Sequence, residues 1–383
     1  MNGTGNMGCV LATGGAGFIG SHTCVELLRA GYRVVILDNF ENADRDVPAR
    51  ISTLAPGDLR LVEGDVRNAR LVAEVLRTHG VDAVIHFAGK KAVGESVADP
   101  LLYYHDNISG AVAVLSAMRA EGVRRLVFSS SATVYGTPEV LPIDESAPTS
   151  IGNPYGRTKL MIEEIIDDVA AADPQFRALS LRYFNPVGAH PSGRIGENPR
   201  GIPNNLFPYV AQTAAGRRAR VEVHGGDYPT PDGTGVRDYV HVVDLARGHL
   251  AAVRHLLGDG AVTLSHDANA RHGRVNIGTG QGHSVLEVIA AFAQASGRDV
   301  PYRIGARRPG DAPASVADAT LAHQLLGWRP QFGLAEMCRD HWRFQAAAQA
   351  AEAAEAGRDL SRQRAVLSLI AGRGTGMGRG ATA

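Results

Sequence analysis

Short apolar segments alternate with amphipathic stretches through the first half of the chain. The segments are rich in β-branched residues and continuous in apolar character, which is typical of strands covered on both faces. The intervals between them leave room for crossover helices, so the pattern predicts an α/β fold with a doubly wound parallel sheet. The predicted strands lie at 9–13, 33–38, 59–65, 82–89, 125–131 and 178–184.

The pattern changes after about residue 185. Residues 186–206 are dense in Gly, Pro and Asn, which indicates either a disordered loop or a binding segment. Short strands, loops and helices then mix up to residue 342. We expect a sheet domain at 8–185 and a smaller, interleaved α/β domain at 186–342, with residues 236–257 returning to the large sheet as a strand and a helix.

The last part of the chain, 346–383, is rich in Ala and then in Gly. Its Ala/Glu portion could extend a helix. The Gly-rich end has too little apolar area to bury, so we expect this tail to be poorly ordered.

Composition narrows the possible functions. The 383 residues carry 39 Lys and Arg against 39 Asp and Glu, so no basic field for nucleic acid is expected. No apolar run reaches the ~18 residues of a membrane span, and the N-terminus lacks a signal-peptide pattern. Cys9, Cys24 and Cys338 are too widely spaced for a metal site and indicate reduced thiols. We expect a cytoplasmic protein without a metal.

A glycine-rich turn follows the first predicted strand. Gly14, Gly17 and Gly20 are spaced three apart between that strand and a helix, where glycines permit a tight turn and close approach of a pyrophosphate. The second strand ends at Asp38, eighteen residues past Gly20. A carboxylate there can bind the adenosine ribose and would repel a 2′-phosphate, which favours NAD over NADP.

Two further strands end at the same edge of the predicted sheet, where the ligand crevice of such a fold lies. We expect Asp65 and Val66 to meet the adenine, and Phe87, Ala88 and Gly89 to border the ribose.

The strand at 125–131 ends in three serines, and a candidate catalytic helix follows. Asn153 can cap this helix, and Tyr155 and Lys159 lie four residues apart on one face of it. A phenol has a pKa near ~10, so general-base work at neutral pH needs a shift of ~3 units, or about 4 kcal/mol. A nearby Lys and a positive nicotinamide ring can supply this stabilisation. Ser131 or Thr133 can share the substrate proton.

Long stretches of the chain resemble known families. Three segments resemble the extended short-chain dehydrogenase/reductase superfamily, which has a Rossmann-type sheet: TGGAGFIGSH, SSSATVYG and PYGRTK. Over about residues 8–342 the chain resembles the UDP-glucose (UDP-galactose) 4-epimerase family, through the segments HFAGKKAVGESV, LRYFNPVGAHPSG, GIPNNL and DYPTPDGTGVRDYVHV. This resemblance implies one tightly held NAD per subunit, a UDP-hexose substrate and a homodimer.

The resemblance also implies roles for individual residues. Tyr155 would take the 4-hydroxyl proton of the sugar, with Ser131 as its hydroxyl partner and Lys159 on the cofactor ribose. A 4-keto sugar would turn about its diphosphate linkage and be reduced from the other face. The expected cofactor contacts are Gly14, Gly17, Phe18, Ile19, Gly20, Asp38, Asn39, Asp65, Val66, Phe87, Ala88, Gly89, Lys91, Asn107, Ser129, Tyr155, Lys159 and Phe184. The expected substrate contacts are Ser131, Asn185, Asn205, Leu206, Val223, His224, Arg237, Arg308, Asp311 and Ser315.

Three positions depart from the family pattern. His224 replaces an aromatic ring against uracil, Asp106 stands where some members have Asn, and Ser315 stands where some carry a bulky Tyr. The small Ser315 predicts room for an N-acetylated sugar. Two other functions stay open. One is a dehydratase or decarboxylase of the same fold, although Ala132 and Thr133 stand where a dehydratase carries acidic proton donors. The other is a non-catalytic NAD sensor.

Overall fold

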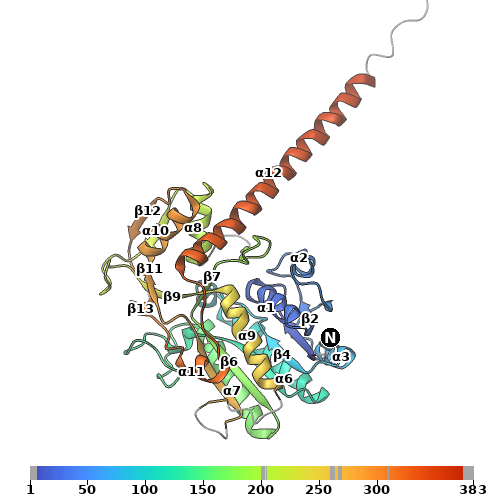
Figure 1. Cartoon of the computed structure of the whole chain (residues 1–383), viewed down its shortest axis with the longest axis vertical. Coiled ribbons are helices and arrows are strands. Elements are labelled where there is room, and N and C mark those ends of the chain that lie inside the picture. The colour runs from blue at the N-terminus through green and yellow to red at the C-terminus, as the bar shows by residue number, and fades with distance from the viewer. Residues whose placement is uncertain are drawn as a thin grey trace, which may run out of the picture.

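The computed structural model describes residues 7–199, 203, 205–258, 264–265, 270–308 and 310–373, with backbone alone at 355–357 and 359–373. A large sheet with helices on both faces forms one part of the molecule. A smaller part, made of short strands and helices, sits beside it, and a long C-terminal helix projects away from both (Figure 1).

Seven parallel strands form the large sheet, in the order β10-β6-β5-β4-β1-β2-β3. Each pair of neighbouring strands is parallel, so the carboxyl ends of all seven strands lie at one edge of the sheet. The strands are β1 Cys9–Thr13, β2 Arg33–Asp38, β3 Leu59–Glu63, β4 Ala83–His86, β5 Arg125–Ser131, β6 Arg177–Tyr183 and β10 His272–Ile277.

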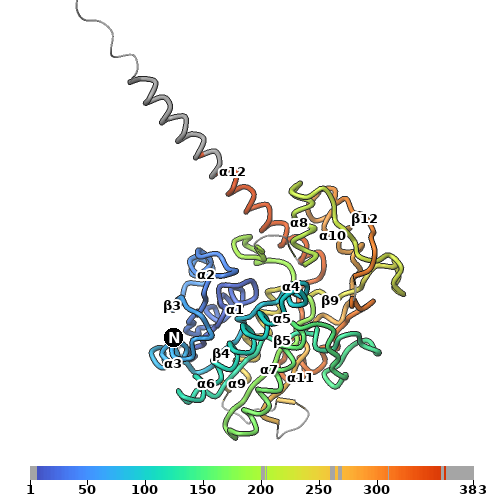
Figure 2. Tube along the Cα trace, turned by 180° about the vertical axis from the view of Figure 1, so that it is seen from behind, coloured from blue at the N-terminus to red at the C-terminus, as the bar shows by residue number. Residues whose placement is uncertain are grey.

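Alternate side chains of each strand enter different hydrophobic cores, as expected for a sheet covered on both faces. Val10 and Ala12 face one core, whereas Cys9 and Leu11 face the other. The first core is covered by α1 Phe18–Arg29, α2 Val47–Leu54, α9 Val242–Leu257 and α11 Thr320–Leu326. The second is covered by α3 Ala69–His79, α6 Ser109–Glu121 and α7 Pro154–Ala172, which Figure 2 shows from behind.

The smaller part has a hydrophobic core of its own, centred on Phe207, Tyr239 and Phe292. Its main sheet runs β11-β9-β13, with β7 also paired to β9. A second, two-stranded sheet pairs β12 with β8. The elements are β7 Asn185–Val187, α8 Leu206–Ala214, β8 Val221–His224, β9 Val236–His241, β11 Gly282–Ser284, α10 Val285–Ser296, β12 Tyr302–Gly305 and β13 Ala314–Ser315.

Short helical elements complete the large part between β4 and α7. They are α4 Val93–Ala98, α5 Pro100–Tyr103, the π-helical turn η1 Tyr104–Ile108 and the 3₁₀ turn η2 Ala132–Tyr135. Both turns lie at the ligand edge of the sheet, directly before α6 and after β5.

The expectation for residues 236–257 was right for the helix and wrong for the strand. Helix α9 packs on the first core, but β9 pairs with β7, β11 and β13 in the smaller part. The strand that does return to the large sheet is β10, which the apolar pattern did not predict. Three predicted strands also differ at their ends: the structure has 59–63, 83–86 and 177–183.

The Ala/Glu portion of the tail does extend a helix, as expected: α12 runs from Leu334 to Arg373. Residues 374–383, including the Gly-rich end, lie outside the described residues. Within the described ranges, none of the helices combines the length and apolar character that a bilayer crossing requires.

Candidate active site

The glycine turn between β1 and α1 leaves no space for side chains. A Cβ on Gly14, whose φ is +68°, would lie 2.8 Å from the backbone N of Ala88. A Cβ on Gly20 would lie 2.5 Å from the carbonyl oxygen of Gly14. The turn is therefore a backbone-lined cradle at the start of a helix, which is the geometry that a dinucleotide pyrophosphate requires.

Asp38 closes this cradle at the end of β2. Its carboxylate accepts hydrogen bonds from the backbone N–H groups of Ala16, at 3.0 Å, and Phe40, at 2.9 Å. Burial raises the pKa of Asp38, and these two hydrogen bonds oppose that shift. The carboxylate lies at the carboxyl end of β2, beside the glycine turn, where it could accept hydrogen bonds from the ribose hydroxyls of NAD. The glycine turn and Asp38 therefore fit this cofactor.

The remaining cofactor candidates are spread along the same edge. Asn39 accepts from the backbone of Glu41, Asp65 is ion-paired to Arg67, and Gly89 abuts the side chain of Asn107. The other candidates at this edge are Phe18 and Ile19 at the start of α1, Val66 after β3, Phe87 and Ala88 after β4, and Ser129 in β5.

The unusual Asp106 belongs to an ion-pair cluster. Its carboxylate lies 2.6 Å from Arg67 Nη1 and 3.6 Å from Lys90 Nζ. The departure from Asn therefore adds a negative charge to a cluster in which Arg67 also pairs with Asp65 and Lys90 also pairs with Glu41.

Asn107 connects the cofactor edge to the catalytic helix. Its Oδ1 accepts from the backbone N of Lys90 at 2.8 Å, and its Nδ2 donates to Thr158 Oγ1 at 3.0 Å. Its side chain thus fixes the loop after β4 relative to α7.

Helix α7 begins as predicted. The Asn153 side chain accepts from the backbone N of Gly156 at 2.9 Å, and Pro154 occupies the first turn. Ile162 and Ile166 lie on the same face of the helix as Tyr155 and Lys159 and pack into the second core, which holds that face against the sheet. Tyr155 and Lys159 consequently face the ligand edge.

A chain of hydroxyl groups ends at Tyr155. Thr133 Oγ1 donates to Ser131 Oγ at 2.9 Å, and the backbone N of Thr133 also donates to that oxygen, at 3.2 Å. Because Ser131 accepts both bonds, its own proton is free for its hydrogen bond to the Tyr155 phenol. The three predicted hydroxyl groups are therefore brought together, and Ser131 donates to Tyr155.

The charges around Tyr155 differ from the prediction. Burial raises the pKa of Tyr155, opposed by the Ser131 hydrogen bond and by the positive charge of Lys91. Lys159 Nζ donates to the carbonyl of Ser129 at 2.7 Å and lies 5.9 Å from the centre of the Tyr155 ring. Burial lowers the pKa of Lys159 to about 8, against the opposing charge of Glu163. Lys91, expected only beside the cofactor, is thus the cation that favours the phenolate.

The predicted nucleotide residues gather in the smaller part. Arg237, in β9, has its Nη2 3.9 Å from Asp311 Oδ1, and it pairs with Ser315 in the β13–β9 ladder. Arg308 and Asp311 act on the pKa of His224, which is lowered mainly by burial. Val223 differs from expectation: its side chain is only 1% exposed and packs in the core, so only its backbone can face a ligand.

The remaining predicted residues belong to several elements. Phe184, expected beside the cofactor, is buried beside Ile143, and Asn185, expected at the sugar, begins β7. Leu206 packs at the start of α8, while Asn205, directly before it, donates from Nδ2 to Glu197 Oε1 at 2.7 Å.

Two buried carboxylates at the site escaped the sequence prediction. Glu163 follows Lys159 by four residues on an otherwise apolar stripe, and that misplaced charge was the available signal. Glu197 lies in the Gly/Pro-rich loop, where no periodicity marks a buried position.

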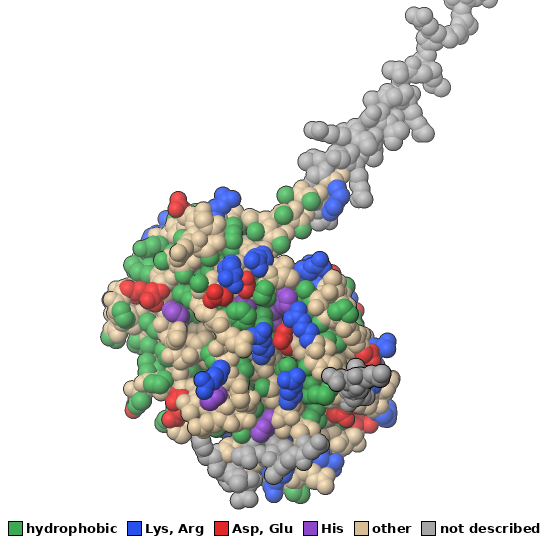
Figure 3. All heavy atoms as spheres, in the orientation of Figure 1, with side chains coloured by type: hydrophobic (Ala, Val, Ile, Leu, Met, Phe, Trp, Pro, Cys, Tyr) green, Lys and Arg blue, Asp and Glu red, His purple; other side chains and the backbone are tan. Residues whose placement is uncertain are grey.

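Figure 3 shows Lys and Arg side chains interspersed with acidic and apolar ones on the face seen there, without a continuous basic patch.

Comparison with known proteins agrees with this geometry. Residues 10–264 match the NAD dependent epimerase/dehydratase family. The UDP-glucose 4-epimerases of Bacillus subtilis and Mus musculus are 53% and 52% identical to the chain, each over 88% of it and 96% of the relative.

Solved structures agree as well. The UDP-glucose 4-epimerase of Stenotrophomonas maltophila, solved with NAD and formylated UDP-arabinopyranose, superimposes with a TM-score of 0.85 at 50% identity over 90% of this chain and 99% of that one. The Bifidobacterium longum enzyme, solved with NAD+ and UDP, gives 0.83 at 48% identity over 88% and 98%. With its Rossmann-type sheet, glycine cradle and Ser–Tyr–Lys constellation, the chain belongs to the UDP-glucose 4-epimerases of the NAD dependent epimerase/dehydratase family.

Proposed function

We propose that this chain interconverts UDP-glucose and UDP-galactose by NAD-dependent inversion of carbon 4 of the hexose. The observation that carries the proposal is the Thr133–Ser131–Tyr155 hydroxyl chain beside the glycine cradle. Relatives that share about half of its residues along 88% of the chain are epimerases with this activity in their names, which supports the same assignment.

The cradle and Asp38 would hold NAD in residues 8–185, and residues 186–342 would hold the UDP-sugar. When bound, NAD supplies the acceptor that takes a hydride from carbon 4 and returns it, so the reaction has no net redox change. Asp38 would bind the adenosine ribose, and Lys159 the ribose next to the nicotinamide.

Tyr155 would act as the general base. It would take the proton of the sugar 4-hydroxyl and return it after the 4-keto sugar has turned. Ser131, whose oxygen already accepts two bonds from Thr133, would use its one proton to donate to the Tyr155 oxygen or, with substrate bound, to the same sugar hydroxyl. Lys91 would favour the phenolate by its charge.

Binding energy would come mainly from the nucleotide. Arg237 and Arg308 would pair with phosphate oxygens, since the guanidinium fork matches phosphate geometry, and Asp311 would bind the uridine ribose. His224 would lie against the uracil. A sugar held mainly through its diphosphate is free to turn, which inversion at carbon 4 requires.

The assay is incubation with UDP-galactose and separation of the products. UDP-glucose is expected, whereas a dehydrated 4-keto sugar would favour a dehydratase. Tyr155→Phe should lower kcat at least about a hundredfold. Tyr32→Phe, which changes another buried tyrosine remote from the ligand edge, is the control and should keep its rate. An unchanged rate in Tyr155→Phe would remove Tyr155 from the mechanism.

We also propose turnover of N-acetylated UDP-hexoses. Ser315 is small and lies beside Arg237, an expected phosphate ligand, in the β13–β9 ladder. UDP-N-acetylgalactosamine should be converted at a measurable rate, and Ser315→Tyr should lower that rate selectively. A rate below about one-thousandth of that with UDP-galactose would overturn the proposal, since this ratio exceeds what loss of one favourable pocket explains.

A homodimer is the assembly that we propose. Exposed apolar side chains lie on helices α4, α5, α6 and α7, of which α4, α5 and α7 contact one another. They are Val93, Val97, Leu101, Val112 and Met161. Such a patch fits a self-complementary, isologous contact with a second copy. Light scattering should give a dimer, and Leu101→Lys a monomer, while Val140→Lys in an unrelated loop stays dimeric. A monomeric wild type would refute the assembly.

We place the protein in the cytoplasm. Cys9, Cys24 and Cys338 are buried and unpaired with one another, which suits a reducing compartment. Cell fractionation would test this, and recovery outside the cytoplasm would refute it.

A further inference from the structure

Glu197 is a buried carboxylate that joins the two halves of the candidate site. Its Oε1 accepts from Lys91 Nζ at 2.8 Å and from Asn205 Nδ2 at 2.7 Å. Lys91 follows β4 at the cofactor edge, whereas Asn205 begins α8 in the smaller part. One oxygen therefore ties together a side chain from each half.

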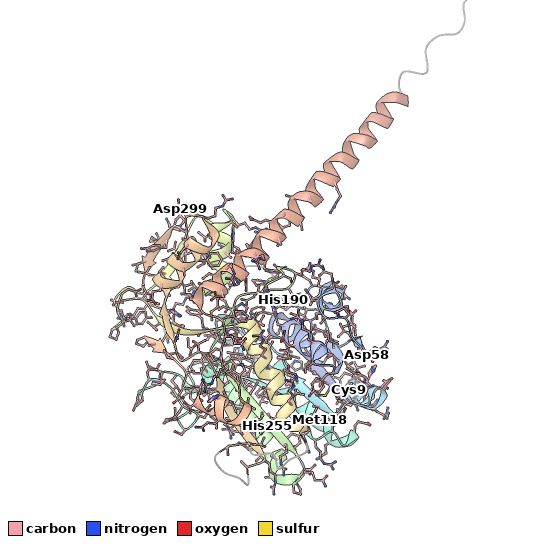
Figure 4. The ribbon with its side chains drawn as sticks, in the orientation of Figure 1. Cys9, Asp58, Met118, His190, His255 and Asp299 are labelled. Atoms are coloured by element: carbon pink, nitrogen blue, oxygen red, sulfur yellow. The ribbon has the colours of Figure 1, made fainter. Side chains whose placement is uncertain are left out.

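The backbone around Glu197 holds this carboxylate in place. The chain turns back at 189–196, where His190 N donates to Ile195 O at 3.1 Å and Ala189 bridges Gly196. The Ile195 side chain is buried in the first core, and Gly196 lies against the Phe344 ring of α12. His190, labelled in Figure 4, lies in this turn between α1 and the base of α12. Glu197 is thus a rigid anchor.

The position is costly for a carboxylate. The Glu197 side chain is 5% exposed, and its Oε2 is among the buried atoms that have no hydrogen-bond partner in the described part of the chain. A buried, half-satisfied carboxylate destabilises a protein unless its charge is matched, so its presence at a ligand site points to a function. The matching charge comes from Lys91.

Lys91 needs such an anchor. Its side chain is 52% exposed, and a long side chain of this kind would otherwise extend into water. Its ammonium is the cation that acts on Tyr155.

We propose that Glu197 is a positioning residue for the epimerisation: it fixes the Lys91 ammonium beside Tyr155 and couples that position to Asn205 of the sugar site. The inference rests on the proposed function of Tyr155 as the base. Loss of Glu197 frees Lys91 to swing into solvent, and the phenolate then loses a nearby positive charge.

Other titratable groups surround this unit and stay in place. Tyr155 faces Tyr103, Tyr183 and Lys159 as well as Lys91. Glu197 faces His341, whose pKa is lowered by burial to about 4, so that ring is neutral in the range of the assay. Glu197→Gln removes a charge that raises the pKa of His341, so that ring stays neutral in the variant as well.

The sign of the pH shift separates positioning from simple charge removal. If Glu197 acts by holding Lys91, Glu197→Gln raises the pKa of Tyr155 and moves the acidic limb of kcat to higher pH. A unit charge at ~6 Å in watery surroundings corresponds to ~0.5 pH unit, or about a threefold loss on that limb. If Glu197 only offsets the charge of Lys91, its removal moves the limb to lower pH.

The test is the pH profile of kcat with UDP-galactose for four proteins: wild type, Glu197→Gln, Lys91→Met and the double variant. Both single variants should shift upward by a similar amount, and the double variant should match Lys91→Met, since Glu197 then has no cation to hold. Glu197→Asp should recover part of the shift. Asp244→Asn, at a buried carboxylate remote from the site, controls for lost stability and should keep the wild-type midpoint.

An unshifted or downward limb in Glu197→Gln overturns the inference, and so does an additive double variant. A wild-type protein without epimerase activity would instead overturn the proposed function, so the two failures are distinguishable.

Discussion

A buried ion-pair network behind the catalytic helix offers a quantitative test of the fold. Glu163 is fully buried on α7 and accepts from Arg182 at 2.6 and 3.0 Å and from Ser130 Oγ at 2.5 Å. Arg274 of β10 adds a further bond at 3.1 Å. Together these bonds join α7 to β5, β6 and β10. Glu163→Gln removes the negative charge and leaves two guanidinium groups facing an amide.

The size of the effect follows from this burial. Breaking a buried ion pair from one side costs about 3–5 kcal/mol. With an unfolding entropy of ~2.1 cal/mol/K per residue, a chain of 383 residues has ~0.8 kcal/mol/K, so Tm should fall by about 4–6 °C. The Arg45–Glu63 pair is the matched control, because it has similar distances but side chains 67% and 53% exposed. Glu63→Gln should leave Tm close to that of the wild type, because an exposed ion pair contributes little to stability.

Calorimetry or thermal melts of the two variants at pH 7 decide the question. The pKa of Glu163 is lowered in the folded protein, chiefly by Arg182 against the cost of burial, so its contribution is present above an unfolded pKa of ~4.5 and intact at pH 7. Equal melting temperatures for the two variants would refute the reasoning that burial sets the value of this ion pair.

Three further outcomes are expected. Burial lowers the pKa of His22 to about 3 and of His341 to about 4, so their contribution to stability is full above the unfolded pKa of ~6.5 and is lost as the pH falls below it. The free energy of unfolding from urea titrations should therefore be lower at pH 5 than at pH 7, by about 2 kcal/mol for each ring, and equal values would contradict this. Gly14→Ala places a Cβ 2.8 Å from Ala88 N, so the purified variant should carry at least about tenfold less NAD by absorbance after denaturation; full occupancy would argue against the cradle. Burial raises the pKa of Cys24, and its thiol should react with a disulfide reagent only after unfolding, so rapid labelling of the native protein would exclude this packing.

Local pattern accounted for much of the central sheet and the catalytic helix. The first strands are continuous apolar runs, and the start of α7 is set by Asn153 and Pro154 within the sequence itself. Because parallel strands end at one edge, the spacing of motifs was enough to predict that Gly14, Asp38 and Tyr155 meet there.

The features that sequence missed depend on distant partners. Strand β10 carries the half-buried Arg274, which donates to Glu163, and the buried Asn276, whose Oδ1 accepts from the Tyr135 hydroxyl. Lys91 was expected beside the cofactor, whereas its ion pair with Glu197 joins residues more than one hundred positions apart in the chain. Hydrophobic periodicity carries no information about such pairs.

The chain passes repeatedly between the two parts: β7 to β9 belong to the smaller part, α9 and β10 to the larger, β11 to β13 to the smaller, and α11 to the larger again. A fragment ending near residue 185 would therefore lose three elements, α9, β10 and α11, that cover its own first core. Neither half can be excised as an autonomous folding unit, so denaturation should proceed as one cooperative event, and any partial proteolytic nick between the halves should release the cofactor and substrate regions together.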